Sequence, residues 1–476
     1  MKLWNYQELN QALQNQLLNN FDNNDLLVET VVIDSRKVTK NSLFIALKGE
    51  NTDGHNYLNQ AFELGASYAL VDRIPDDLKD IFKPHLILVK NTYLALDYLA
   101  KFARERFKGK VIGLTGSVGK TTTKEMLGIA FASQGKTHIN QGNFNNHIGL
   151  PLSLANLPSS AEFAIFEMGM NHFNEISHLT KICQPDIAII TNVGPVHIEF
   201  FANEQEIAKA KSEIFHGLTP NGFVILNKDN PHYDFIYKQA LLNNINPDHI
   251  FSFGESLTAN YRLINSTFNE NKIVSNNEAI INNQNTYSFS LNTINHGHIL
   301  NSLISIACLD ILKADIKSAL LALEGYNNSN GRGKVNNINF ENKKIAIIDD
   351  SYNASILSMK AGIENCFNLK KIFNYSRIIL AIGDMLELGE KSTEIHQDLL
   401  KFINNLKPDS VILVGKELSK ANETLKIANA INFSDSLSAQ QYFLNHLKNN
   451  DLTYIKGSRG IKMEKLIENI IPKNHA

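Results

Sequence analysis

Short apolar runs alternate with longer amphipathic segments along most of the chain. In the final third, apolar runs at 344–348, 377–382, 410–414 and 453–455 are separated by stretches whose apolar residues recur at helical spacing. Such runs are typical of buried strands, and a recurrence every three to four residues is typical of helices. Regular alternation of the two predicts a parallel sheet with helices packed on its faces.

Breaks in this alternation divide the chain into parts. The first part, up to about residue 84, alternates strand and helix patterns in the same way. An asparagine-rich segment at 227–298 with short alternating stretches predicts a small β-rich insert. A stretch rich in glycine and asparagine at 325–333 predicts an interdomain linker. We therefore expect an α/β protein of three domains, at 1–84, 85–326 and 327–476, with a mainly parallel sheet in the second and a Rossmann-like third.

A glycine-rich turn at 113–123 lies between an apolar run and an amphipathic helix. Gly116 and Gly119 would let backbone N–H groups converge on a phosphate at the positive end of that helix. Lys120 would reach the outer phosphates, and Thr121 would bind Mg²⁺. The general P-loop pattern has its first glycine one residue later, so the generic match is imperfect. The alternative is an ordinary glycine-rich turn with a solvated lysine.

Two more apolar runs end in polar residues at the edge where the P-loop is expected. The run at 163–166 leads into Glu167, and the run at 186–190 leads into a turn that contains His197. A carboxylate at the end of a strand beside a P-loop can hold Mg²⁺ directly or through water. Taken alone, Glu167 could also be a surface carboxylate and His197 an ordinary loop histidine, and the polar loop at 140–147 could be solvated coil.

Lys211 lies on the apolar face of a predicted helix at 204–215. It follows Ile207 by four residues and precedes Ile214 by three, which is the spacing of one helical face. Burying a lysine is costly unless it is paired or neutralised, and desolvation lowers its pKa. The pattern predicts a free amine available for chemistry, with extension of the side chain to solvent as the alternative.

Composition narrows the class of protein. The 476 residues carry a formal net charge of −2, which provides no broad basic surface for nucleic acid or an anionic membrane. Three isolated cysteines lack the paired spacing of a disulfide framework or a zinc site. No apolar run approaches the roughly 18 residues of a membrane span. We expect a cytoplasmic monomer that has neither nucleic acid nor a membrane as a partner.

Several motifs together resemble those of the Mur ligase family, over nearly the whole chain. The family's own P-loop variant, Gly-x-Thr-Gly-x-x-Gly-Lys-Thr, accounts for the displaced glycine. The clusters at 34–36 and 53–55 are similar to its nucleotide-sugar domain. The motifs at 349–354 and 383–389 resemble the member that adds D-alanyl-D-alanine.

Two motifs depart from the usual pattern of the family. Ser355-Ile356 stands where Asn-Pro is usual. Of the motif Gly-x-His-Asn-x-x-Asn, only the final asparagine, Asn301, is kept. The nucleotide contact that the family would assign to Asn301 therefore rests on one matching residue.

The resemblance implies an ATP-dependent amide ligase that joins D-alanyl-D-alanine to UDP-N-acetylmuramoyl-tripeptide through an acyl phosphate, in peptidoglycan precursor synthesis. ATP and Mg²⁺ are implied, together with a carbamylated Lys211 that binds a second Mg²⁺ beside His197. The implied catalytic residues are Lys120, Glu167, His197 and Lys211, and the implied metal ligands are Thr121, Glu167, His197 and Lys211. The implied ATP-binding residues are Gly116, Ser117, Gly119, Lys120, Thr121, Thr122, Asn301, Arg332 and Asp350. The implied substrate-binding residues are Ser35, Arg36, Asp53, His55, Asn143, Asn146, Tyr352 and Asn353.

Two other functions are also consistent with the sequence. The first is another enzyme of the same superfamily, such as the preceding muropeptide ligase or a folylpolyglutamate-type synthetase, although the motifs of the last third argue against both. The second is a P-loop switch or ATP-driven binding module without ligase chemistry. Phosphate release that depends on both the tripeptide and the amine would distinguish a ligase from such a module.

Overall fold

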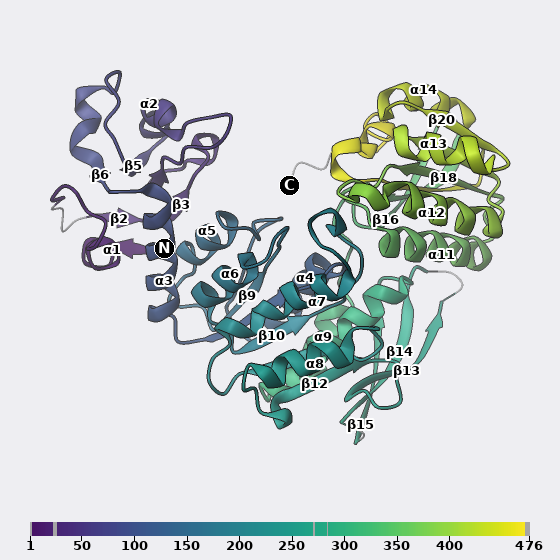
Figure 1. Ribbon diagram of the computed structural model, residues 1–476, viewed down its shortest axis with the longest axis horizontal. Helices are drawn as coiled ribbons and strands as arrows, with labels where there is room; N and C mark the ends of the chain where they lie inside the picture. Colours follow the sequence, from purple (N-terminus) through teal and green to yellow (C-terminus); the bar gives the residue numbers. More distant parts are fainter. Residues whose placement is uncertain (1, 22–25, 270–271, 283, 472–476) are drawn as a thin grey trace.

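The computed structural model describes residues 2–21, 26–269, 272–282 and 284–471, which form three α/β domains around separate sheets. The central domain lies between the other two (Figure 1). The predicted fold class is therefore confirmed. Within these described residues, no helix has the length and apolar character needed to cross a membrane.

The N-terminal domain is a four-stranded parallel sheet in the order β3-β4-β5-β6. Its strands are β3 (Thr30–Val32), β4 (Ser42–Ile45), β5 (Ala66–Val71) and β6 (Leu86–Leu88). Helices α1 (Tyr6–Leu13) and α3 (Thr92–Arg106) pack on one face, and α2 (Leu58–Glu63) packs on the other. A short antiparallel pair, β1 (Trp4–Asn5) and β2 (Leu27–Val28), lies outside this sheet. Because β6 pairs with β5, we propose that the first domain boundary lies after β6 rather than at residue 84.

The central domain is a nine-stranded sheet in the order β15-β14-β13-β12-β11-β10-β7-β9-β8. The strands from β8 to β13 are parallel, and β14 and β15 run antiparallel to their neighbours. The strands are β7 (Lys110–Thr115), β8 (Thr137–Ile139), β9 (Phe163–Glu167), β10 (Ile187–Ile190), β11 (Phe223–Asn227), β12 (Ile250–Gly254), β13 (Tyr261–Phe268), β14 (Ser275–Ile281) and β15 (Asn285–Leu291).

Helices cover both faces of the central sheet. One face packs against α4 (Lys120–Ala132), α9 (His296–Ile311) and α10 (Ile316–Leu323). The other packs against α5 (Gly149–Ala155), α6 (Glu175–Cys183), α7 (Glu204–Ser212) and α8 (Tyr233–Leu242). This arrangement leaves the carboxyl ends of β7, β9 and β10 at one edge, where open α/β sheets bind ligands.

The segment at 227–298, predicted to be a small β-rich insert, is rich in strands but forms part of the central sheet. Its strands β12 to β15 extend the central sheet, and their inward residues join the core beneath α9 and α10. Tyr261, Leu263 and Phe289 are buried there. The short alternating stretches noted in the sequence correspond to these half-buried strands.

The C-terminal domain is a six-stranded sheet in the order β16-β17-β21-β18-β19-β20, parallel except for β16. Its strands are β16 (Lys334–Phe340), β17 (Lys343–Asp350), β18 (Arg377–Gly383), β19 (Ser410–Val414), β20 (Ala430–Phe433) and β21 (Asp451–Lys456). Helices α11 (Ile356–Phe373), α12 (Ser392–Leu406) and α13 (Lys416–Leu425) pack on one face, and α14 (Ser436–His446) packs on the other. After β21 the chain forms a short 3-10 turn, Met463–Leu466.

Candidate active site

A cavity of about 640 Å³ lies between the carboxyl edge of the central sheet and the C-terminal domain. Its walls come from the P-loop, the loops after β9 and β10, helix α7, the start of α9, and the ends of β17 and β21. The predicted site residues that line it are Ser117, Gly119, Lys120, Thr121, Thr122, Asn143, Asn146, Glu167, His197, Lys211, Asn301, Arg332, Asp350, Tyr352 and Asn353.

The P-loop joins β7 to α4 in a conformation that only glycine adopts easily. Gly119 has φ +88° immediately before the first residue of α4. A Cβ on Gly116 would lie 2.0 Å from Thr191 Oγ1, so the turn packs directly on the end of β10. Lys120 Nζ donates to Gly116 O at 2.6 Å, and burial lowers the pKa of this lysine against the opposing charge of Glu167. The turn is thus preorganised, with its lysine folded back over it.

Glu167 ends β9 and is held from several sides. Its carboxylate accepts from Thr121 Oγ1 at 2.9 Å and from Asn145 Nδ2 at 2.7 Å. Its backbone N–H donates to Asn140 Oδ1 at 3.0 Å. The residue is only 2% exposed, which excludes the alternative of a surface carboxylate in a turn. A fixed carboxylate beside a P-loop threonine is a suitable arrangement for a divalent cation.

Lys211 is buried in α7 and lines the cavity. Its side chain does not extend to solvent, since the residue is 2% exposed. Among the residues that the structure describes, no carboxylate forms an ion pair with it. Burial and the nearby positive charge of Lys120 hold the pKa of Lys211 well below its usual range. Both effects favour the neutral form of the amine that lines the cavity.

His197 faces the cavity from the turn after β10, in a left-handed conformation with φ +61°. Its Nδ1 contacts the carboxylate of Glu387, which comes from the C-terminal domain. The hydrogen bond from His197 lowers the pKa of Glu387. Next to this contact, Glu199 N donates to Glu387 O at 3.3 Å. His197 therefore takes part in a contact between two domains as well as lining the cavity.

The two domains also pack closely where α11 begins. Leu357 of the first turn of α11 lies against Gly194 of the loop after β10. A Cβ added to Gly194 would stand 2.2 Å from Leu357 Cδ1. With Leu357 in this position, only a residue without a side chain allows the approach, so the cavity wall is continuous across the domain boundary.

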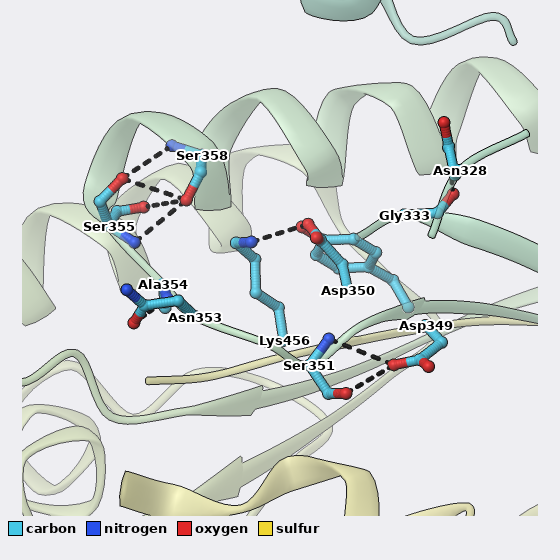
Figure 2. A network of polar contacts seen from close by, with 11 residues as sticks. Asn328, Gly333, Asp349, Asp350, Ser351, Asn353, Ala354, Ser355, Ser358 and Lys456 are labelled. Atoms are coloured by element: carbon cyan, nitrogen blue, oxygen red, sulfur yellow. Dashed lines mark hydrogen bonds and ion pairs between the residues drawn. The ribbon is translucent and has the colours of Figure 1, made fainter. Parts of the chain in front are cut away.

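The end of β17 carries a polar network at the C-terminal side of the cavity (Figure 2). Asp350 Oδ2 accepts from Lys456 Nζ at 2.7 Å and from Tyr454 OH at 2.8 Å. The guanidinium of Arg332 stacks over the ring of Tyr352 at 4.0 Å. Asp350 therefore reaches the cavity already paired with a lysine, whereas Arg332 is oriented by stacking.

The altered motif before Asn301 brings His298 to the cavity wall. The Asn301 amide touches the P-loop, since a Cβ on Gly119 would lie 3.0 Å from Asn301 Nδ2. His298 Nδ1 is buried without a hydrogen-bond partner. Burial lowers the pKa of His298 to about 4, so the ring is neutral at ordinary pH. A neutral imidazole, that of His298, thus occupies the position of the first asparagine in the usual family motif.

Four predicted substrate residues, Ser35, Arg36, Asp53 and His55, lie in the N-terminal domain and are absent from the cavity lining. Asp53 contacts the buried His55 at 2.7 Å and the guanidinium of Arg73. Burial alone would raise the pKa of Asp53, but these hydrogen bonds lower it overall. Lys37, next to Arg36, places Nζ 5.3 Å from the ring centre of Phe144 in the loop at 140–147. This contact connects the N-terminal turn to the loop that borders the cavity.

Comparison with known proteins identifies the family. Three family models match: the Mur ligase catalytic domain at 27–102, the middle domain at 114–309 and the glutamate ligase domain at 336–459. A UDP-N-acetylmuramoyl-tripeptide–D-alanyl-D-alanine ligase of Rickettsia prowazekii is 36% identical over 98% of this chain and 99% of its own. The chain belongs to the Mur ligase family.

Further relatives within the Mur ligase family agree. A Bacillus subtilis protein with the same name is 33% identical over 94% of this chain and 93% of its own. The crystal structure of MurF from Acinetobacter baumannii has a TM-score of 0.84 at 30% identity, covering 98% of both chains. MurF from Thermotoga maritima, solved in complex with ADP, has a TM-score of 0.76 at 29% identity and covers 93% of this chain and 97% of its own.

Several residues of this Mur ligase site were not predicted from the sequence. Asn145 and Lys124 contact Glu167, and Glu387 contacts His197. Lys456 ends β21, and His298 lies in the altered motif before Asn301; neither was predicted as a site residue. Each acquires its position from a contact between residues far apart in the chain, which local patterns do not reveal. The polar loop at 140–147 was the one available signal for Asn145.

Proposed function

We propose that this protein is the Mur ligase that joins D-alanyl-D-alanine to UDP-N-acetylmuramoyl-tripeptide, at the expense of ATP, in peptidoglycan precursor synthesis. The main support is that one cavity brings together a P-loop, a buried carboxylate and a buried lysine of lowered pKa, opposite the strand ends of a second domain. Relatives that carry this name match over almost their whole length. A bound ADP in the Thermotoga structure supports the use of ATP.

Amide formation from a carboxylate needs activation, because oxide is a poor leaving group. In the proposed reaction, an oxygen of the tripeptide's terminal carboxylate attacks the γ-phosphorus of ATP, and ADP leaves. The amine of D-alanyl-D-alanine then attacks the acyl carbon and gives up a proton, and phosphate leaves from the tetrahedral intermediate. The protein's task is to align the reacting groups and to stabilise the charge that builds up.

The P-loop is suited to hold the phosphates during this reaction. Its backbone N–H groups and the start of α4 provide a positive cradle. In this structure Lys120 Nζ donates a hydrogen bond to Gly116 O. We propose that the side chain turns to the outer phosphates when a nucleotide binds. The nucleotide would be contacted from the other walls by Asn301, Arg332 and Asp350. Lys456, which is hydrogen-bonded to Asp350, would lie beside it.

The donor set beside the P-loop fits Mg²⁺. Thr121 and Glu167 supply a hydroxyl and a carboxylate oxygen, which are hard ligands of the kind Mg²⁺ prefers. Among the described residues there is no group of three or more His, Cys, Asp or Glu side chains able to hold a metal alone. The phosphates of the nucleotide would therefore complete the coordination. Bound there, Mg²⁺ would neutralise charge on the transferring phosphoryl group.

Lys211 fits the carbamate that the family resemblance implies. Carbamate formation joins a neutral amine to CO₂ and releases a proton, so a buried amine with a lowered pKa is a suitable starting group. The carbamate would be an anion at a position where no carboxylate is described. His197 also lines the cavity, although its Nδ1 already contacts Glu387. We propose Lys211 as the carbamylated residue and His197 as its companion ligand for a second Mg²⁺.

The substrates would reach the cavity from opposite domains. We propose that the UDP part of the sugar nucleotide binds near Ser35, Arg36, Asp53 and His55, and that its peptide extends past Asn143 and Asn146. The contact between Lys37 and Phe144 supports this route. D-alanyl-D-alanine would enter beside Tyr352 and Asn353 of the C-terminal domain. The predictions of a cytoplasmic location and a monomeric state stay predictions.

Phosphate release by the purified protein tests the proposal. With ATP and Mg²⁺ present, we expect release only when both UDP-N-acetylmuramoyl-tripeptide and D-alanyl-D-alanine are added. Release with the tripeptide and a different amine would assign the protein to another ligase of the family. Release that ignores both substrates would leave only a P-loop ATPase.

A further inference from the structure

Lys124 is a buried lysine that lines no part of the cavity, yet it lies between two parts of the site. It follows Lys120 by one helical turn in α4 and is 2% exposed. Burial lowers its pKa, and the charge of Glu167 opposes that shift. An ammonium group at such a position costs free energy unless its N–H groups are satisfied. The contacts of Lys124 therefore indicate its role.

The two contacts of Lys124 join a loop to a carboxylate. Nζ donates to Gly142 O at 2.7 Å, and it lies 3.9 Å from Glu167 Oε2. Gly142 has φ +51°, a left-handed conformation that glycine adopts easily, and its carbonyl accepts this bond from the helix. One ammonium group thus connects the P-loop helix, the loop and the carboxylate proposed to bind Mg²⁺.

The same loop is attached to Glu167 at two more points. Asn145 donates to the carboxylate, and Asn140 bonds the backbone of Glu167. Asn143 and Asn146, between and beside these anchors, line the cavity. The anchors at 140 and 145 are neutral amides, and Lys124 supplies the charged contact at the tip of the bend. Charge-assisted hydrogen bonds are the stronger kind.

We propose that Lys124 is a positioning residue that fixes the loop at 140–147 in the shape that receives the peptide of the UDP-sugar substrate, and that it does not help to bind the metal. The proposal rests on the proposed function, because it takes UDP-N-acetylmuramoyl-tripeptide as the ligand. A positive charge 3.9 Å from Glu167 opposes a divalent cation at that carboxylate. Losing Lys124 should therefore weaken tripeptide binding while leaving metal binding unchanged or tighter.

The test compares Lys124→Met with the wild-type chain by direct binding. Titration calorimetry gives the affinity for UDP-N-acetylmuramoyl-tripeptide, and the electron paramagnetic resonance signal of Mn²⁺ gives the affinity for the metal in the presence of ADP. We expect K124M to weaken tripeptide binding about tenfold or more, as for the loss of one charge-assisted hydrogen bond. Mn²⁺ affinity should not fall, and Lys124→Arg should recover part of the tripeptide affinity.

Thr123→Val is the matched control, because Thr123 is the neighbouring buried residue of α4 and its Oγ1 has no hydrogen-bond partner. It should leave both affinities unchanged, and a thermal melt of each variant checks the fold. Unchanged tripeptide affinity in K124M, or a parallel loss of Mn²⁺ affinity, would overturn the proposal. A wild-type chain that does not bind the tripeptide nucleotide would instead refute the proposed function itself.

Discussion

Lys211 is buried in α7, where a charged lysine costs free energy. Desolvating an ammonium group is expensive, and the positive charge of Lys120 adds to that cost. A methionine or leucine would pack on the same face of α7 without either penalty. This cost is the reason for proposing a chemical role for the Lys211 nitrogen.

Replacing Lys211 with alanine should reduce turnover by a factor of about 10² or more while leaving the fold intact. The reason is loss of the anion that a carbamate would provide near the transferring phosphoryl group. Short carboxylic acids added to the assay should restore part of the rate. Lys209→Ala, on the exposed face of the same helix, should behave like the wild type. Full activity of K211A would contradict a chemical role for this lysine.

The proposed role of Glu167 in binding Mg²⁺ can be tested by the metal dependence of turnover. Changing it to glutamine keeps the hydrogen bond from Thr121 but removes the charge. We expect the Mg²⁺ concentration needed for half-maximal turnover to rise by about tenfold or more, since a carboxylate is a far better ligand than an amide. Glu324→Gln, at the exposed end of α10, serves as the control. An unchanged Mg²⁺ titration would show that the metal binds elsewhere.

At the scale of elements, the sequence patterns correctly predicted the strands that are buried on both faces of their sheet. The strands β7, β9 and β10 are continuous apolar runs, so the positions of the P-loop and of Glu167 followed from the sequence. Strands β16 and β20 were missed because they lie at the two edges of their sheet and bury few residues. Lys124 was missed for a related reason, since α4 carries polar residues on several sides and spacing alone does not reveal the Gly142 contact.

The start of α11 explains the departure from Asn-Pro. Ser355 is the N-cap of α11, its Oγ accepts from Ser358 N at 3.3 Å, and Ser358 Oγ accepts from Ser355 N at 3.0 Å (Figure 2). The pair forms a capping box that satisfies two backbone donors of the first turn. A serine therefore begins this helix with its own side-chain hydrogen bonds.

Ser355→Ala should cost about 1 kcal/mol of stability, the usual value for loss of an N-cap. Because Ser355 also lines the cavity, the same change should lower the affinity for the substrates. Asp435→Ala removes the equivalent cap of α14, which is outside the cavity lining, and should cost a similar amount without affecting turnover. Denaturant melts and steady-state rates measure the two effects. Equal rates in both variants would mean that the start of α11 only supports the fold.

At the scale of the whole molecule, the site exists only where two domains meet. The central domain supplies the P-loop, Glu167 and Lys211, and the C-terminal domain supplies Arg332 and Asp350. Neither set follows from the other in the sequence, because more than a hundred residues separate them. The contact of His197 with Glu387, across this boundary, is one of the interactions that holds the domains in this arrangement.

Glu387→Ala should weaken that arrangement by up to about 1 kcal/mol, the range measured for partly exposed ion pairs. Small-angle X-ray scattering of the free protein should show a larger radius of gyration, with Glu390→Ala as a control on the same loop. The hydrogen bond lowers the pKa of Glu387, so the contribution is present above the ordinary value of 4.5 and is lost as the pH falls below it. Identical scattering curves would show that other contacts suffice.

The close approach of Gly194 and Leu357 limits how such enzymes can be recombined. The linker at 325–333 looks like a natural crossover point for exchanging the amine-binding half of one ligase for that of another. The two residues lie on opposite sides of that point, and their surfaces match to within a methyl group. In a chimaera with a larger residue at 194, either the Leu357 side chain would have to change position or the two domains would have to move apart. We therefore expect domain exchange to succeed more often when residues 194 and 357 come from the same parent.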